Sequence, residues 1–211
     1  MTLRGKFQSY RHARRRRTWG AAAPRRTERG AVAVEAAIIT PLLVALAFGI
    51  IEFGLLLKDD LGVTSSVRAG ARMASAEPRA ATFAQDAANQ VAREGSALDM
   101  TKVRALWVYK ADPAYISTRG TPLGGSGTFN ACSACVKFVW SAGAKKFVVS
   151  GTPSWTPTQQ NACSGDVNRD SVGVYLKYDH PAVTNLFFRQ FTLTSHTVMS
   201  LEPIPSSSPC K

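Results

Sequence analysis

The fold is decided by one apolar stretch, residues 31–57, which reads AVAVEAAIITPLLVALAFGIIEFGLLL. At about 1.5 Å per residue a helix of this length reaches roughly 40 Å, which exceeds a hydrocarbon core about 30 Å thick. A buried helix of a soluble protein is the alternative, but such a helix usually carries a polar stripe, and residues 36–51 contain no charged side chain. The sequence therefore predicts a single transmembrane helix.

Positive charge is concentrated in front of this helix. Residues 1–30 hold ten of the 26 lysine and arginine residues and one glutamate, so that +9 of the net charge of +12 lies there. A basic segment before the span and an acidic pair after it, Asp59 and Asp60, predict an N-terminus in the cytoplasm and a C-terminal body outside the membrane. Because the charge forms a tail rather than a surface of the folded body, we expect no nucleic-acid partner.

Four cysteines follow the span, and none precedes it: Cys132, Cys135, Cys163 and Cys210. An external body favours two disulfides, and four cysteines allow three pairings. The spacing of Cys132 and Cys135 also occurs in zinc sites and in redox centres. However, no second pair completes four zinc ligands, and a loop rich in glycine precedes the pair where a redox site would have a strand and a helix. We therefore predict neither a metal nor a cofactor.

Two acidic residues interrupt the apolar stretch, where an ionised carboxylate is costly. Glu35 and Glu52 lie about 26 Å apart on a helix, so each is placed to reach one edge of the bilayer. For Glu52 the predicted role is this interfacial one alone. For Glu35 a second role is open: if the chain were cut after Gly30, Ala31 would carry a free amine, and the amine of a neighbouring subunit would pair with Glu35.

The segment RGAVAVEAAIITPLL, residues 29–43, followed by GIIEFG, residues 49–54, resembles the TadE-like family of tight-adherence (Tad) type IV pilus systems. The likeness covers residues 29–72, and a looser one continues over residues 172–181 and 191–203. The resemblance implies cleavage between Gly30 and Ala31 by a prepilin peptidase and a part for Glu35 in processing or assembly. Ala36 stands where pilins of these systems often carry tyrosine, which favours a minor pseudopilin over a major pilin.

The body is predicted to be α+β and pilin-like. Helical spacing continues beyond the span through Leu57, Leu61, Thr64, Val67, Ala71 and Ala74 to about Ala76, and a second helix is expected over 80–94 with Phe83, Ala87 and Val91 inward. Alternating patterns then predict strands of an antiparallel sheet over residues 103–109, 136–140, 146–149, 172–178 and 191–201.

The predicted organisation has five parts. These are a basic cytoplasmic leader (1–30), the transmembrane helix (31–57), an external helical segment (58–98), an antiparallel-sheet domain (99–202) and a tail rich in proline and serine (203–211). The protein is expected in the cytoplasmic membrane with a single span. The resemblance adds incorporation into a surface pilus, with other pilin and pseudopilin subunits, the assembly machinery and the lipid bilayer as partners.

No catalytic residue is predicted. His196 adjoins Ser195 on a strand, so their side chains point to opposite faces and form no catalytic pair. Asp166, Asn168 and Asp170 have the spacing that opens a calcium loop, but Lys177 replaces the glutamate at the twelfth position, and a turn is the better interpretation. Beside a pilus component, the sequence leaves open an uncleaved, membrane-anchored protein that binds a ligand through its external domain.

Overall fold

A computed structural model describes residues 26–185, 188–205 and 209–210. Most of the predicted basic leader, residues 1–25, and part of the predicted tail, residues 206–208 and 211, lie outside the described residues. The chain divides into two compact units, Met1–Val44 and Ala45–Lys211. In the first, the described residues all belong to helix α1 (Arg26–Ala76), which continues into the second unit.

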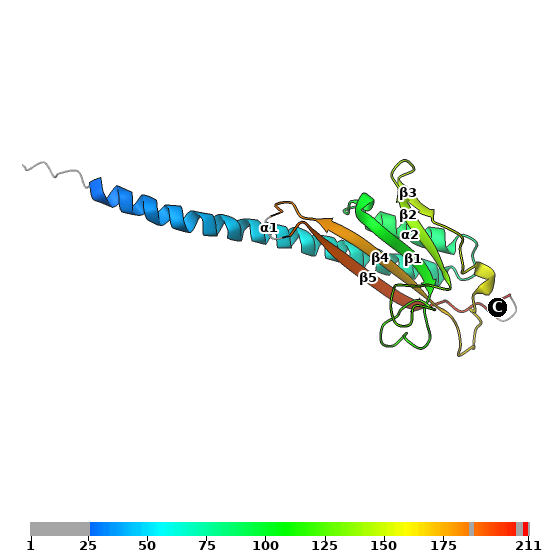
Figure 1. Cartoon of the computed structure of the whole chain (residues 1–211). Helices are drawn as coiled ribbons and strands as arrows, with labels where there is room; N and C mark the ends of the chain where they lie inside the picture. Colours follow the sequence, from blue (N-terminus) through cyan, green and yellow to red (C-terminus); the bar gives the residue numbers. More distant parts are fainter. Residues whose placement is uncertain (1–25, 186–187, 206–208, 211) are drawn as a thin grey trace, which may run out of the picture. The chain divides into compact units, whose positions relative to one another are not determined.

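The second unit is α+β, as predicted from the sequence. Within it the rest of α1 is followed by helix α2 (Phe83–Glu94) and by five strands. The strands are β1 (Val103–Lys110), β2 (Cys135–Ser141), β3 (Lys146–Val149), β4 (Ser171–Pro181) and β5 (Gln190–Ser200), with short 3₁₀ helices over Met100–Lys102 and Pro157–Gln159 (Figure 1).

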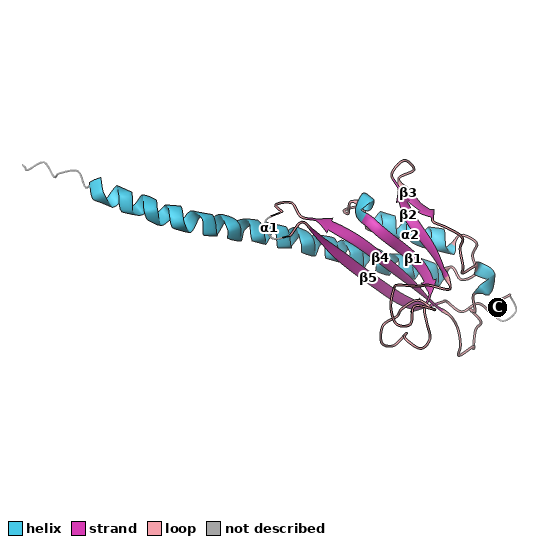
Figure 2. Cartoon of the chain, viewed as in Figure 1, coloured by secondary structure: helices cyan, strands magenta, loops and turns pink. Residues whose placement is uncertain are grey.

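The five strands form one antiparallel sheet in the order β3-β2-β1-β4-β5. Both helices lie on the same face of this sheet (Figure 2). The molecule therefore has two layers in this unit, and the sheet ends in a short strand, β3, on one side and a long strand, β5, on the other.

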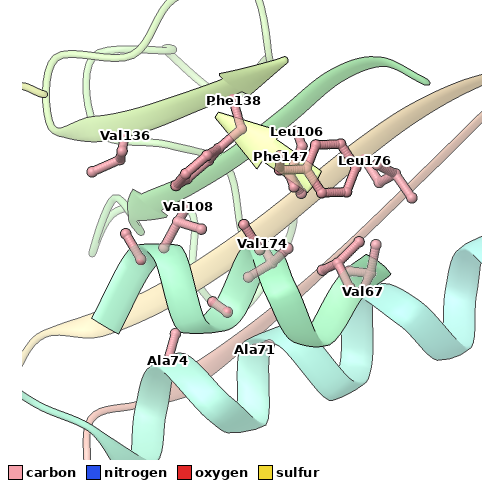
Figure 3. Packing of buried hydrophobic residues seen from close by; sticks show 14 of the residues in the cluster. Val67, Ala71, Ala74, Leu106, Val108, Val136, Phe138, Phe147, Val174 and Leu176 are labelled. Carbon is pink, nitrogen blue, oxygen red and sulfur yellow. The ribbon is translucent and has the colours of Figure 1, made fainter. Parts of the chain in front are cut away.

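The core fills the space between the helices and the sheet (Figure 3). Helix α1 contributes small side chains, α2 contributes the predicted inward residues, and β4 contributes every second residue. The fully buried apolar residues of these three elements include Val63, Val67, Ala71, Ala74, Ala87, Val91, Val172, Val174 and Leu176. Small residues on α1 let the two helices approach closely, because a Cβ at Gly70 would lie 2.5 Å from Cγ2 of Val91.

Two details of the predicted core differ in the structure. Leu57 and Leu61 were expected on the buried stripe of α1, yet they are 61% and 70% exposed. The buried stripe instead contains Glu52, Asp59 and Val63, so polar contacts to the sheet decide which side of the helix faces inward here. The pattern of apolar residues alone places the stripe correctly only from Val67 onward.

Strand β1 also buries both of its faces. Leu106 and Val108 face the helices and are fully buried. Tyr109, from the other alternating set, is buried as well, in a second cluster with Ala111, Cys135 and Tyr175. The loop between β1 and β2 covers this cluster, and Phe129 from that loop stacks on Tyr175 with ring centres 4.2 Å apart.

Candidate functional site

The predicted processing site lies inside helix α1. Gly30 and Ala31 are helical, and both are exposed. A Cβ at Gly30 would meet no atom within 4 Å, so nothing in the described part of the chain covers this peptide bond. Glu35 is also exposed, and among the described residues it has no hydrogen-bond or ion-pair partner. The structure therefore brings Gly30, Ala31 and Glu35 onto one short, accessible stretch of helix.

The large apolar side chains that follow Glu35 on α1 are mostly exposed, which is unusual for a helix of this composition. Ile38, Leu42, Ile50 and Leu61 are between 65% and 71% exposed, and the apolar part of Gly30–Ala76 is long enough to cross a membrane while only 6% of it is buried within the protein. A core helix of a soluble protein would bury such residues. The helix thus has the properties of a membrane span rather than of a core element.

Glu52 joins the helix to the sheet, which the sequence did not predict. It is fully buried, and its carboxylate accepts hydrogen bonds from the backbone N–H groups of Val183 and Thr184 at 2.9 and 3.1 Å. The hydroxyl of Thr184 donates a third bond at 3.1 Å. The expectation that Glu52 only reaches the bilayer edge is therefore wrong: it holds the loop between β4 and β5 against α1.

A second polar contact lies two helical turns further along α1. Asp59 is buried and accepts hydrogen bonds from His180 Nδ1 at 2.8 Å and from the hydroxyl of Tyr178 at 3.3 Å. Burial, together with the negative charge of Asp59, raises the pKa of Tyr178 to about 12, so this hydroxyl stays a donor at neutral pH. Asp59 therefore holds β4 on the helix, and Glu52 holds the loop that follows β4.

The four cysteines form two disulfides, one of the three pairings that the sequence allowed. Cys132 pairs with Cys135, and Cys163 pairs with Cys210. The first closes a short turn where the loop between β1 and β2 enters β2. The second fastens the C-terminal segment to the loop before β4, where the backbone of Cys210 also accepts a bond from Ala162 N–H.

The calcium candidate residues form a turn. Asp166 accepts bonds from the backbone N–H of Asn168 at 2.8 Å and from the side-chain amide of Asn161 at 2.9 Å. Asp170 lies 2.8 Å from the ammonium group of Lys110. Among the described residues no group of three or more histidine, cysteine or acidic side chains is arranged to hold a metal ion. The carboxylates of Asp166 and Asp170 bind protein groups.

The contacts of Glu52 and Asp59 were accessible to sequence reasoning only in part. An acidic residue within an apolar stretch signals that a partner exists, but the partner of Glu52 is backbone in a loop 131 residues away. His180 stands next to Pro181 with no pattern that links it to α1. The signals were therefore the unusual acidic residues themselves, without any indication of what they bind.

Comparison with known proteins identifies one segment. Residues 30–72 match the family model described as TadE-like protein. No curated protein and no solved structure matches the chain. The matched residues include the predicted cleavage site, Glu35, the apolar stretch and Glu52, whereas the sheet lies beyond them.

The TadE-like domain confirms the resemblance found in the sequence and links the chain to Tad pilus-associated pseudopilins. Proteins of this family are structural components of a pilus system, which implies association with other pilus subunits. The described residues contain one helix, near the N-terminus, that is long and apolar enough to span a membrane, and together with the match it indicates a membrane-anchored protein.

Proposed function

We propose that this protein is a minor pseudopilin of a Tad pilus, cut after Gly30 by a prepilin peptidase, with a structural part in pilus assembly or initiation. The observation that carries the proposal is the TadE-like match over residues 30–72, which covers the cleavage site and the whole apolar stretch. The basic residues before the span favour an N-terminus inside the cytoplasm and the sheet domain outside.

The geometry around Gly30 supports cleavage. A peptidase must reach the bond between Gly30 and Ala31, and both residues are exposed. Glycine before the bond leaves one side of the peptide without a side chain, and no described atom lies near the position of a Cβ there. Glycine is also a poor helix former, so the local helix opens at low cost when an enzyme binds.

Glu35 supports the assembly role. An unpaired carboxylate within hydrocarbon is costly, and the described part of this chain gives Glu35 no partner. The new amine of Ala31 on a neighbouring subunit is a cation of suitable position, since cleavage places it four residues before Glu35. Pairing between the two would set the stagger between adjacent helices.

Glu35→Ala tests this role in cells that assemble the pilus. We expect the variant to enter the membrane at the wild-type level, because removal of a charge makes the span more apolar. We expect its amount in the isolated pilus fraction, or in the assembly complex, to fall about tenfold or more, which corresponds to loss of one charge pair in a membrane.

Asp60→Ala is the matched control, because Asp60 is an exposed carboxylate on the same helix beyond the apolar stretch. Immunoblots of the membrane and pilus fractions give both quantities. Normal incorporation of the Glu35→Ala variant would contradict the charge-pairing role. An uncut chain that never enters the pilus fraction would favour an anchored ligand-binding protein instead.

A further inference from the structure

The long outer strand of the sheet, β5, has an open edge. We define the β5 edge as the backbone N–H and C=O groups of the residues in β5 that point away from β4. The hydrogen bonds of the residues just before and just after β5 show which residues of the strand point away from β4. Leu201 N–H donates to Asp170 C=O, and Ala182 N–H donates to Arg189 C=O, in the same register as the eleven residue pairs of β4 and β5.

Bonded and non-bonded pairs alternate along an antiparallel ladder. The odd-numbered residues of β5 therefore bond to β4, and the even-numbered residues direct both backbone groups outward. Among the described residues, no backbone hydrogen bond outside the strand ladders engages these outward groups. The residues concerned are Gln190, Thr192, Thr194, His196, Val198 and Ser200, of which all but Val198 are exposed.

Soluble proteins usually protect such edges with lysine, proline, a bulge or a short strand. Strand β5 has none of these: its eleven residues, QFTLTSHTVMS, contain no proline and no acidic, lysine or arginine side chain, and its register with β4 is unbroken. The opposite edge, β3, is protected. It has four residues, begins with Lys146, and its Phe147 carbonyl accepts a bond from the side chain of Gln85 at 3.0 Å.

A second copy of β5 related to the first by a twofold axis along the strand does not fit this edge. Strand β5 begins just after the loop held by Glu52, and it ends just before Glu202, whose N–H donates to the carbonyl of Ser75. It therefore runs in the same direction as the part of α1 between Glu52 and Ser75 (Figure 1). Two copies with the same orientation in the membrane present parallel β5 edges. In a parallel pair, each bonding residue of one strand lies opposite a non-bonding residue of the other. A twofold axis along the strand instead places each residue opposite its own copy, so the two edges do not pair.

We propose that the β5 edge binds an extended, uncharged segment of a different subunit of the same pilus assembly, which adds a sixth strand to the sheet. Backbone bonds would supply the affinity, and alternate side chains the specificity. Phe191, 47% exposed on the helix-facing side of β5, is the apolar side chain that the added strand would cover. This inference rests on the proposed function, because it requires incorporation into the assembly.

Hydrogen exchange of the full chain measures the state of the edge directly. In the detergent-solubilised chain the amides of Thr192, Thr194 and His196 should exchange fast, while those of Leu193 and Ser195, which bond to β4, should exchange slowly. In the isolated pilus or assembly complex the three fast amides should become protected at least about tenfold.

Three substitutions separate backbone pairing from other effects. Thr194→Pro removes an outward N–H that β4 does not use, a position where a strand tolerates proline, and should reduce incorporation about tenfold or more. Thr194→Val keeps the N–H and should incorporate normally. Val149→Pro places proline at an outward N–H of the opposite edge, since Ser150 N–H bonds inward to Lys137, and should also incorporate normally.

The outcomes are distinct. Protected edge amides in the assembly, with loss only for Thr194→Pro, support the inference. Wild-type chain present in the pilus fraction with Thr192, Thr194 and His196 still exchanging fast overturns it and leaves the proposed function intact. Wild-type chain absent from the fraction overturns both. If Thr194→Pro fails to form the disulfides of the native fold, the wild-type exchange result alone decides.

Discussion

Glu52 shows how one residue can connect the long apolar helix α1 to the sheet. Its two carboxylate oxygens accept three hydrogen bonds from Val183 and Thr184. Bonds between a carboxylate and backbone N–H groups are stronger than those between neutral groups, and no apolar residue could replace them. The position of the loop between β4 and β5 therefore depends on the negative charge of this side chain.

Glu52→Gln should loosen that loop. The amide keeps one oxygen but presents an NH₂ group to backbone donors, which leaves the N–H of Val183 or of Thr184 without its acceptor. We expect the unfolding temperature of the detergent-solubilised chain to fall by several degrees, and the loop around Thr184 to become sensitive to protease. Asp60→Asn, an exposed change on the same helix, should leave both unaltered. Equal unfolding temperatures for the two variants would contradict the role assigned to Glu52.

Asp179 provides a pH-dependent contribution to stability. Burial opposes its ionisation, but hydrogen bonds from Arg104 and Thr192 outweigh burial and hold its pKa below the ordinary value. A carboxyl group with a depressed pKa in the folded state stabilises the fold above its unfolded pKa, near 4, and this contribution is lost as the pH falls through the folded value.

Asp179→Asn should therefore reduce the free energy of unfolding by about 1 to 3 kcal/mol at pH 7, the usual range for a bond to a charged group. The difference from the wild type should shrink as the pH falls below about 4, because the unfolded wild-type carboxyl group then binds a proton and the folded one follows at its lower pKa. Urea unfolding at pH 7 and pH 3 measures both differences. A gap that stays the same at the two values would show that the charge of Asp179 contributes nothing.

At the scale of elements, the contact between α1 and α2 depends on a glycine. A Cβ at Gly70 would lie 2.5 Å from Val91 Cγ2 and 3.2 Å from the carbonyl oxygen of Ala87. Gly54, on the same helix, has no atom within 4 Å of the corresponding position. Two glycines of one helix thus differ in whether a neighbouring element restricts them.

Gly70→Val should lower the free energy of unfolding by about 1 to 3 kcal/mol, because the helices must separate to admit the side chain. Gly54→Val is the matched control and should leave the body unchanged. Denaturant unfolding followed by tryptophan fluorescence, with buried Trp155 as one reporter of the core, measures the effect. A Gly70→Val variant as stable as the control would mean that α2 does not pack tightly on α1.

The two disulfides should differ in what they contribute. Cys163 and Cys210 are 47 positions apart, whereas Cys132 and Cys135 are separated by three. In the chain-entropy model a cross-link stabilises more when it closes a longer loop, so Cys210→Ser should cost about 4 kcal/mol and Cys132→Ser about 2. Unfolding of the two variants without reducing agent compares them. A larger loss for Cys132→Ser would contradict the loop-length argument.

At the scale of the whole molecule, sequence patterns predicted the order and type of all five strands and both helices. The 3.6-residue and two-residue periods are local, and turn residues such as Gly95 mark the boundaries. The face of each element was harder to predict. Leu106 and Tyr109 lie on opposite faces of β1 and both are buried, because a distant loop covers the outer face. Such coverage has no local signal.

The candidate site likewise has one part that the sequence predicts and one part that only the packing of the sheet on the helix determines. Gly30, Ala31 and Glu35 follow one another along a single helix, so the sequence contains their arrangement. The contacts of Glu52 with Thr184 and of Asp59 with His180 join residues more than a hundred positions apart. They depend on how the sheet packs against the helix, which no spacing in the sequence specifies.

The mature N-terminus shows most directly whether the chain is processed as a pseudopilin. Intact mass and N-terminal sequence should be measured on the protein extracted from membranes of cells that contain a prepilin peptidase, without reducing agent. We predict a chain that begins at Ala31, with a mass four hydrogens below that of the reduced form because two disulfides are present. A chain that still begins at Met1 would contradict cleavage after Gly30.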